Sequence, residues 1–169
     1  NLGIDDNLKK NNCLSYQTIL FKMLGLEKYL TKTNNYIQLF LTDIEKNNAA
    51  DFLTTKKVDI KNDIIIGLNI GAGNKWPVKR WNINNAKKLI TLLLKHFKNK
   101  RLKIVIFNGQ LEQENYKFFK KNFKNSNVIN LEAGCLNLRQ FAATLYFCNI
   151  IITTDSLAFH IASSLKKKI

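Results

Sequence analysis

From residue 64 onward, runs of aliphatic residues alternate with longer segments whose apolar positions recur every three or four residues. The aliphatic runs are rich in β-branched residues, which is typical of buried strands, and the longer segments have the spacing of amphipathic helices. Strands are expected at residues 64–70, 103–107, 128–131 and 150–152, and helices at residues 84–98, 111–124, 138–147 and from 156 onward. This alternation predicts βαβ units. We therefore expect an α/β fold, with a Rossmann-like parallel sheet and helices on both faces.

The first sixty residues do not share this alternation. Their apolar positions predict a helix at residues 15–26, a short strand at 36–41 and a second helix at 43–54, for which Asp43 is the expected cap. The chain opens on an asparagine and ends on Ile169, which has the character of the first residue of a further strand. Because a sheet cut there would have an unprotected edge, we expect the chain to be truncated at both ends.

Charge is the most unusual feature of the composition. The chain holds 27 Lys and Arg against 12 Asp and Glu, which is a net charge of +15. Such a balance favours polyanionic partners, namely nucleic acid, anionic lipid or phosphorylated substrates. Lysines are also spread through nearly every segment, so a solvated basic surface explains the same number.

The cysteines and histidines do not form a metal site in the sequence. Cys13, Cys135 and Cys148 lie far apart and form no Cys-x-x-Cys pair, which argues against a zinc site or a disulfide framework and favours a reducing compartment. His96 and His160 lack Cys or Glu partners at ligand spacing. Apolar runs stay well short of the roughly 18 residues of a membrane helix. We expect a cytoplasmic protein without a metal.

Three polar turns follow the expected strands, at residues 71–81, 108–114 and 153–160. Ligands of an open parallel sheet bind outside the carboxyl ends of the strands, so these turns are the candidate site. The first turn begins Gly71-Ala72-Gly73, whose small residues let backbone amides approach a ligand, and then offers the charges of Lys75, Lys79 and Arg80. It is neither a P-loop nor a Gly-x-Gly-x-x-Gly fingerprint.

The other two turns each allow two interpretations. Glu112 and Glu114 in the second turn are placed either to accept the hydroxyls of a ribose or to favour a helix dipole. In the third turn, Asp155 or Ser156 is the expected helix cap, and His160 follows one turn later. The amino end of such a helix suits an anion such as phosphate, but a capped helix with a packed histidine has the same pattern. Ser156 does not lie in a Gly-x-Ser-x-Gly elbow, so a hydrolase has little support.

Together these motifs resemble glycosyltransferase family 9, the ADP-heptose:lipopolysaccharide heptosyltransferases. The resemblance lies in Lys79-Arg80-Trp81 after the Gly-Ala-Gly loop, in the turn from Gly109 to Glu112, and in Asp155-Ser156 followed by His160-x-Ala162. It implies a GT-B architecture of two Rossmann-like domains. Residues 1–60 would be the end of the N-terminal domain and the interdomain linker, and residues 61–169 a C-terminal nucleotide-sugar-binding domain that is incomplete at its C-terminus.

The resemblance also implies roles for residues. Lys79 would contact the donor phosphates and stabilise the charge of the transition state, with His160 as a second catalytic candidate, and Glu112 would bind the nucleoside. The donor-binding residues implied in this way are Gly71, Ala72, Gly73, Lys79, Glu112, Asp155, Ser156, Leu157 and His160. The chain departs from the family where Leu157 replaces a frequent glycine and Asn82 a frequent proline.

The implied activity is the inverting, metal-independent transfer of heptose or a related sugar from a nucleoside-diphosphate sugar, such as ADP-heptose. The acceptor would be the anionic core of lipopolysaccharide, with no cofactor and with attachment to the periphery of the inner membrane. No residue matches the family's catalytic base, so we expect this piece to bind donor without turnover. Two alternatives stay open: a GT-B transferase with another donor, and a non-catalytic basic domain that binds nucleic acid, for which no RRM, KH or zinc signature is present.

Overall fold

The computed structural model describes residues 10–30, 37–73 and 77–169, and the chain divides into two compact units, Asn1–Ile37 and Gln38–Ile169. Lys75 and Trp76 in the first polar turn lie outside the described residues. Each unit is described here by itself.

In the first unit the described residues form helix α2 (Tyr16–Met23) and one 3-10 turn, η1 (Glu27–Tyr29). Ser15 caps α2, because its Oγ accepts a hydrogen bond from the N–H of Thr18 at 3.1 Å. Gly25 ends the helix with a φ of +65°, a left-handed conformation that favours glycine. The helix predicted at residues 15–26 is thus present in a shorter form.

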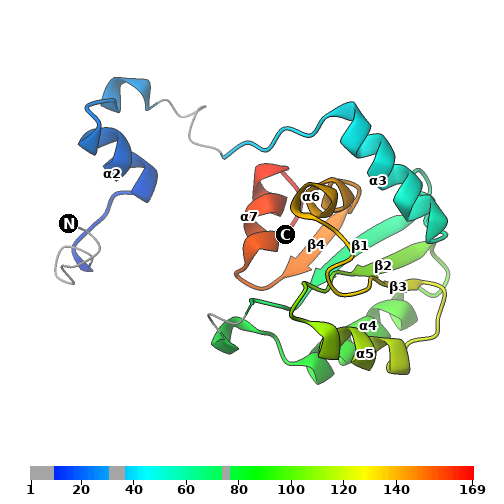
Figure 1. Cartoon of the computed structure of the whole chain (residues 1–169). Helices are drawn as coiled ribbons and strands as arrows, with labels where there is room; N and C mark the ends of the chain where they lie inside the picture. The colour runs from blue at the N-terminus through cyan, green and yellow to red at the C-terminus, as the bar shows by residue number, and fades with distance from the viewer. Residues whose placement is uncertain (1–9, 31–36, 74–76) are drawn as a thin grey trace. The chain divides into compact units, whose positions relative to one another are not determined.

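The second unit is built on a sheet of four parallel strands in the order β3-β2-β1-β4 (Figure 1). The strands are β1 (Ile64–Asn69), β2 (Leu102–Ile106), β3 (Val128–Asn130) and β4 (Ile150–Thr153). Helices connect or flank them: α3 (Asp43–Thr55), α4 (Ile83–His96), α5 (Gln113–Asn122), α6 (Leu138–Tyr146) and α7 (Leu157–Ser164), with a 3-10 turn η2 (Pro77–Lys79) before α4. The predicted α/β class and parallel sheet are confirmed.

Helices cover both faces of this sheet. Successive residues of a strand point to opposite faces, so Ile65 packs under α3, α6 and α7, while Ile66 packs under α4 and α5 (Figure 1). The first core includes Leu53 of α3 and Leu145 of α6, and the second is centred on the fully buried Phe119 of α5. Because both faces are apolar, the strands read as continuous aliphatic runs in the sequence.

The packing is tightest around Gly67 in the middle of β1. A Cβ atom there would lie 2.9 Å from Sγ of Cys148 and 3.2 Å from the ring of Phe107. Cys148 is fully buried, and this burial raises the pKa of its thiol to about 12. The thiol is therefore an unreactive part of the core. Because Sγ of Cys148 and the ring of Phe107 lie so close, only glycine fits well at position 67.

Two predicted helix caps need correction. Thr42, and not Asp43, caps α3: its Oγ1 accepts the N–H of Glu45 at 3.2 Å, and the Glu45 carboxylate accepts the N–H of Thr42 at 2.8 Å. Two amides are satisfied by this reciprocal arrangement, which a lone Asp43 cannot provide. At α7 the cap residue is Ser156, but its side chain makes no capping hydrogen bond.

The strand predicted at residues 36–41 is wrong for 37–41, and residue 36 lies outside the described residues. Leu39 and Leu41 instead pack against the core shared with α3 and α6, so their apolar character serves packing without a strand partner. The second compact unit spans Gln38–Ile169 and includes α3, whose Leu53 is buried in its core, while the predicted domain boundary at residue 60 stays a prediction. The assignment of the upstream residues to an N-terminal domain stays a prediction.

The chain continues past α7 along the outer edge of β4. Lys168 forms a parallel bridge with Ile150, and its carbonyl accepts the N–H of Ile151 at 2.8 Å. Across the described ranges, no helix has the length and apolar character needed to cross a bilayer.

Candidate functional site

The first and third polar turns meet at the carboxyl ends of β1 and β4. Oγ1 of Thr154 donates a hydrogen bond to the carbonyl of Gly71 at 2.7 Å, and the N–H of Thr154 bonds to the carbonyl of Asn69 at 3.3 Å. Nζ of Lys79 lies 2.6 Å from Oδ2 of Asp155. Residues more than 70 positions apart in the chain are thus joined on one rim of the sheet, as parallel-sheet topology predicts.

The second turn joins the same rim through Glu112. Its carboxylate lies so close to Gly71 that a Cβ atom on that glycine would be 1.3 Å from Oε1. Oε2 accepts the N–H of Gly109 at 2.7 Å, which holds the carboxylate at the start of α5. Glycine at position 71 is therefore what allows Glu112 to occupy this place.

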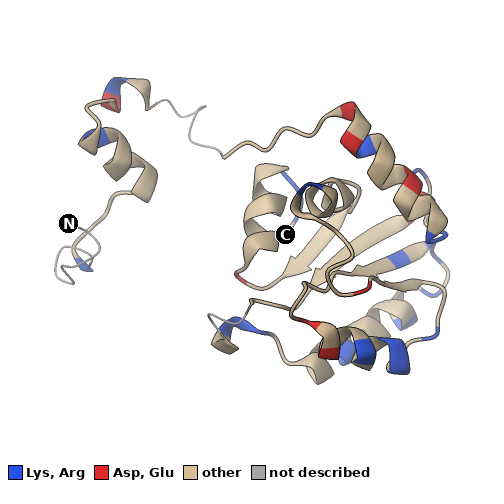
Figure 2. Ribbon diagram, viewed as in Figure 1, with Lys and Arg blue, Asp and Glu red and all other residues tan. Residues whose placement is uncertain are grey.

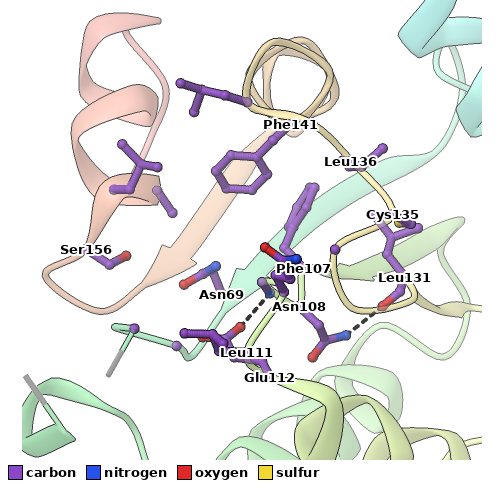
Figure 3. Close-up of a pocket in the computed structure, with 18 of the residues that line it drawn as sticks. Asn69, Phe107, Asn108, Leu111, Glu112, Leu131, Cys135, Leu136, Phe141 and Ser156 are labelled. Carbon is purple, nitrogen blue, oxygen red and sulfur yellow. Dashed lines mark hydrogen bonds between the residues drawn. The ribbon is translucent and has the colours of Figure 1, made fainter. Parts of the chain in front are cut away.

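These turns surround a cavity of about 590 Å³, which we call the rim cavity. Four segments line it, namely residues 69 and 71–73, residues 107–112, residues 131 and 134–138 with Phe141, and residues 156–158. Figure 3 shows Glu112, Asn69 and Ser156 on separate segments around this space, with Phe107 and Phe141 against each other. The two rings meet edge to face with their centroids 5.2 Å apart. The cavity thus combines an aromatic and aliphatic wall with a few polar groups, which is the usual character of a small-molecule site.

Seven residues of the predicted site reach the rim cavity or its edge directly. Gly71, Ala72, Gly73, Glu112, Ser156 and Leu157 line it, and Asp155 lies next to Ser156 in the turn before α7. Glu114, the second acidic candidate, does not: it is exposed and pairs with Lys117 at 3.1 Å. The carboxylate available to a ligand in this turn is therefore that of Glu112.

Lys79 and Asp155 form an exposed ion pair beside the rim cavity. Their side chains are 41% and 64% exposed. The hydrogen bond from Lys79, together with its charge, lowers the pKa of the Asp155 carboxyl below its ordinary value, and His160 adds a smaller effect of the same sign. The neighbouring Arg80 is used differently, because its Nε and Nη2 both donate to the carbonyl of Gly73 and so fasten the first turn.

The start of α7, from Ser156 to Ala158, lines the rim cavity. The hydroxyl of Ser156 lies 3.2 Å from Oγ1 of Thr153 and so does not cap the helix. The amino end of a helix carries a partial positive charge, and an anion is stabilised there when its amides are unoccupied. His160 lies one turn further on, exposed at the surface, with its ring edge to face with Phe159; it does not line the cavity.

Sequence reasoning missed residues 134–138, which we call the fourth wall of the rim cavity. Residues 134–138 follow β3, as the other turns follow their strands, so the same rule about strand ends identifies them. It also missed Asn69 and Asn108, whose Oδ1 atoms are buried without a hydrogen-bond partner. The Nδ2 of Asn108 donates to the carbonyl of Leu131 at 2.7 Å, which ties the second turn to the fourth wall (Figure 3).

The arrangement suits a ligand with a planar apolar part, hydroxyl groups and negative charge. The aromatic wall accepts the first, the Glu112 carboxylate accepts hydrogen bonds from the second, and the amides of α7 with Lys79 attract the third. Among the residues the structure describes, no three His, Cys, Asp or Glu side chains are grouped to hold a metal ion.

The family model described as glycosyltransferase family 9 (heptosyltransferase) matches residues 3–169. The search of curated proteins found no match.

Three similar solved structures are the Escherichia coli ADP-heptose lps heptosyltransferase II, a glycosyl transferase family 9 protein from Veillonella parvula, and the E. coli heptosyltransferase WaaC with ADP. Their identities to this chain are 22%, 20% and 18%, with TM-scores of 0.65, 0.75 and 0.55. The matches cover 83%, 92% and 91% of this chain but 40%, 43% and 44% of those chains, so this chain spans less than half the length of these structures. At these identities the likeness is one of fold.

Proposed function

The chain belongs to glycosyltransferase family 9, and on this premise we propose that it forms the donor-binding part of an inverting, metal-independent glycosyltransferase. The single observation that carries the proposal is that Glu112 and the amino end of α7 line one cavity, with Lys79 beside it in an ion pair with Asp155. These are the groups that a nucleoside diphosphate requires: an acceptor for ribose hydroxyls, and positive charge for phosphate.

Within the proposed donor complex, the base lies against the wall formed by Phe107, Phe141 and residues 134–138. Glu112 accepts hydrogen bonds from the ribose, since Oε1 is not used by Gly109. The diphosphate lies between Gly71-Ala72-Gly73 and the first turn of α7, where Leu157 and Ala158 line the cavity and their amides would donate to it. Lys79 then exchanges the carboxylate of Asp155 for a phosphate oxygen.

The proposed reaction is a direct displacement at the anomeric carbon of the sugar. An acceptor hydroxyl loses its proton to a carboxylate outside these residues and attacks, and the bond from the anomeric carbon to the phosphate oxygen breaks. Negative charge then grows on the departing nucleoside diphosphate. Lys79 and the α7 amides stabilise that charge, and losing one such donor typically costs about 3–4 kcal/mol of barrier. His160, exposed beside Asp155, is a second candidate for this role.

We propose ADP-heptose as donor and lipopolysaccharide core as acceptor. Supporting the donor, the solved E. coli WaaC structures with a similar fold contain ADP or ADP-2-deoxy-2-fluoro heptose. Supporting the acceptor, heptosyltransferase II is named for lipopolysaccharide. No cofactor is proposed, because the nucleotide sugar is itself the substrate.

Titration calorimetry of this chain with ADP, UDP and GDP tests the proposal. ADP should bind, UDP and GDP should bind more weakly, and Glu112→Gln should weaken ADP binding by roughly 10-fold or more, since it removes a charged acceptor. Glu114→Gln is the matched control and should leave the affinity unchanged, because Glu114 faces away from the cavity. Preference for UDP or GDP would indicate another donor class, and no nucleotide binding would overturn the proposal.

A further inference from the structure

Among the helices of the second unit, the positive charge lies mainly in one of the two layers. Helices α4 and α5 together carry six lysines and one glutamate. The helices of the opposite layer, α3, α6 and α7, carry one lysine and one arginine against three acidic residues. In Figure 2 the ribbon of α5 carries blue segments, whereas α7 is tan along its length. A compositional bias toward lysine would load both layers alike, so the segregation is a property of the folded unit.

The six lysines form a surface that we call the lysine face: Lys87, Lys88, Lys95, Lys117, Lys120 and Lys121. Both helices turn their apolar sides to the sheet, through Ile90 in α4 and Phe119 in α5, so their lysines lie on the outward side. All except Lys87 are exposed. Within the described part of the chain, Lys117 is the only member that forms an ion pair, with the exposed Glu114. Such an exposed pair neutralises little of the field.

The shape and chemistry of the lysine face favour an extended anionic partner. None of its lysines lines the rim cavity, and the face is the outside of a helix pair. Leu92 lies on the same side of α4, four residues after Lys88 and three before Lys95, and its side chain is 63% exposed. An exposed aliphatic residue within a set of lysines is the combination that lies at a membrane interface. Tyr116, Phe118 and Phe119 of α5 are not exposed, and among the described residues of these two helices the one exposed ring is that of His96 at the end of α4, so the row of stacking rings typical of single-strand binding is lacking there.

We infer that the lysine face docks the protein on an anionic lipid bilayer, with Leu92 entering the interface. Each lysine near such a surface strengthens binding about five-fold at low salt, and the attraction is screened by added salt. The face belongs to the layer opposite α6 and α7, so bilayer contact leaves the rim cavity at the strand ends uncovered. An acceptor anchored in the same membrane would therefore stay within reach of the site. The docking itself does not depend on the proposed transferase activity.

Co-sedimentation of the chain with vesicles tests this inference. We expect binding to vesicles of phosphatidylcholine with phosphatidylglycerol, little binding to pure phosphatidylcholine, and release by salt. The double variant Lys120→Glu/Lys121→Glu should lower the partition coefficient at least ~20-fold. The matched control is Lys56→Glu/Lys61→Glu, which makes the same change in net charge at exposed positions outside the lysine face and should retain most of the binding. Leu92→Ser should give an intermediate loss without a change of charge.

Three results would overturn the inference. Equal losses in the two double variants would mean that net charge alone acts, and equal binding to neutral vesicles would remove the electrostatic basis. Tighter binding to an oligonucleotide than to anionic vesicles, with the same sensitivity to Lys120 and Lys121, would assign the face to nucleic acid. Circular dichroism shows whether each variant is folded, and ADP binding is scored separately, so failure of the docking and failure of the donor site are distinguishable.

Discussion

Lys79 reaches across the rim of the sheet to Asp155, which follows it by 76 positions, and its Nζ lies 2.6 Å from Oδ2 of that carboxylate. The pair joins the first and third turns beside the rim cavity. In the protein without a ligand, the Asp155 carboxylate is the anion that pairs with Lys79. Binding of a diphosphate at the amino end of α7 must therefore break this pair, and the two residues should have opposite effects on binding.

The first prediction concerns this exchange. Lys79→Ala should weaken ADP binding about 10-fold to 100-fold, because a charge-assisted hydrogen bond to phosphate is lost. In the complete enzyme it should lower kcat by about 10²–10³. Asp155→Asn should leave ADP affinity equal or raise it, because the competing charge is removed. Calorimetry measures both, with Lys121→Ala on the outward side of α5 as control. A Lys79→Ala variant with wild-type affinity and rate would exclude Lys79 from phosphate binding.

A second prediction follows from the contact between Gly71 and Glu112. Gly71→Ala should lower the free energy of unfolding by about 1–3 kcal/mol and weaken ADP binding, because the new Cβ displaces the carboxylate. Adding Glu112→Ala should recover part of the lost stability but not the binding, so the two changes should not be additive. Gly109→Ala is the control, since its Cβ would meet Glu112 at an ordinary 3.5 Å. Urea denaturation provides the comparison, and additive effects would contradict the contact.

The third prediction is a pH dependence of stability that arises from Glu45. Hydrogen bonds from Arg139 and from the backbone of Thr42 lower its pKa from 4.5 to about 2. Because the pKa of Glu45 is lower in the folded than in the unfolded chain, ionised Glu45 stabilises the folded state. This stabilisation is complete above about pH 4.5 and is lost as the pH falls toward 2. Arg139→Ala should therefore lower stability more at pH 6 than at pH 3.

Urea unfolding at the two pH values tests the role of Arg139. Lys46→Ala is the control, because Lys46 pairs at 3.1 Å with the exposed carboxylate of Asp43 and not with Glu45. It should keep the wild-type change of unfolding free energy between the two pH values. If Arg139→Ala also kept the wild-type change of unfolding free energy between these pH values, the low pKa of Glu45 would have another origin.

A fourth prediction uses the three cysteines as reporters. Cys13 and Cys135 are exposed, whereas Cys148 is buried with a raised pKa. A thiol reagent at pH 8 should therefore modify two thiols in the folded chain and the third only in denaturant. Cys135 should react more slowly than Cys13, because partial burial raises its pKa. Since Cys135 lines the rim cavity, ADP should slow it selectively, and mass spectrometry identifies the protected residue. Protection of Cys13 alone would place the nucleotide elsewhere.

The strands and helices of the second unit were predictable because their apolar residues serve one purpose, burial on both faces of a sheet. Ile65 and Ile66 pack on opposite faces, and both are required by the parallel arrangement. The segment at 37–41 has apolar residues like those of the strands, but it does not pair with a strand. The sequence of a segment does not show whether a partner strand lies beside it. Thr42 was missed as a cap because the reciprocal bond with Glu45 depends on two residues at once.

The site was predictable where the backbone sets it. Gly71, Glu112 and Ser156 line the rim cavity because each lies just beyond or near a strand end. Spacing alone did not separate Glu112 from Glu114, since that depends on the direction of the first turn of α5, and the preference for Glu112 came from the family resemblance. The contributions of Asn69 and Asn108 were also hidden, because an asparagine at a strand end has the same sequence signature whether its oxygen is satisfied or not. The roles of Lys79 and His160 in catalysis stay predictions.

The bond network of Arg139 has a mechanical consequence. Its guanidinium holds the carbonyl of Phe40 at 2.7 Å, at the point where the polypeptide enters the compact unit, and the same turn of α6 supplies Asn137 and Leu138 to the cavity wall. Arg139 thereby links the backbone at Phe40 to the segment that supplies Asn137 and Leu138 to the cavity wall. A substitution at this one side chain should therefore loosen both places at once.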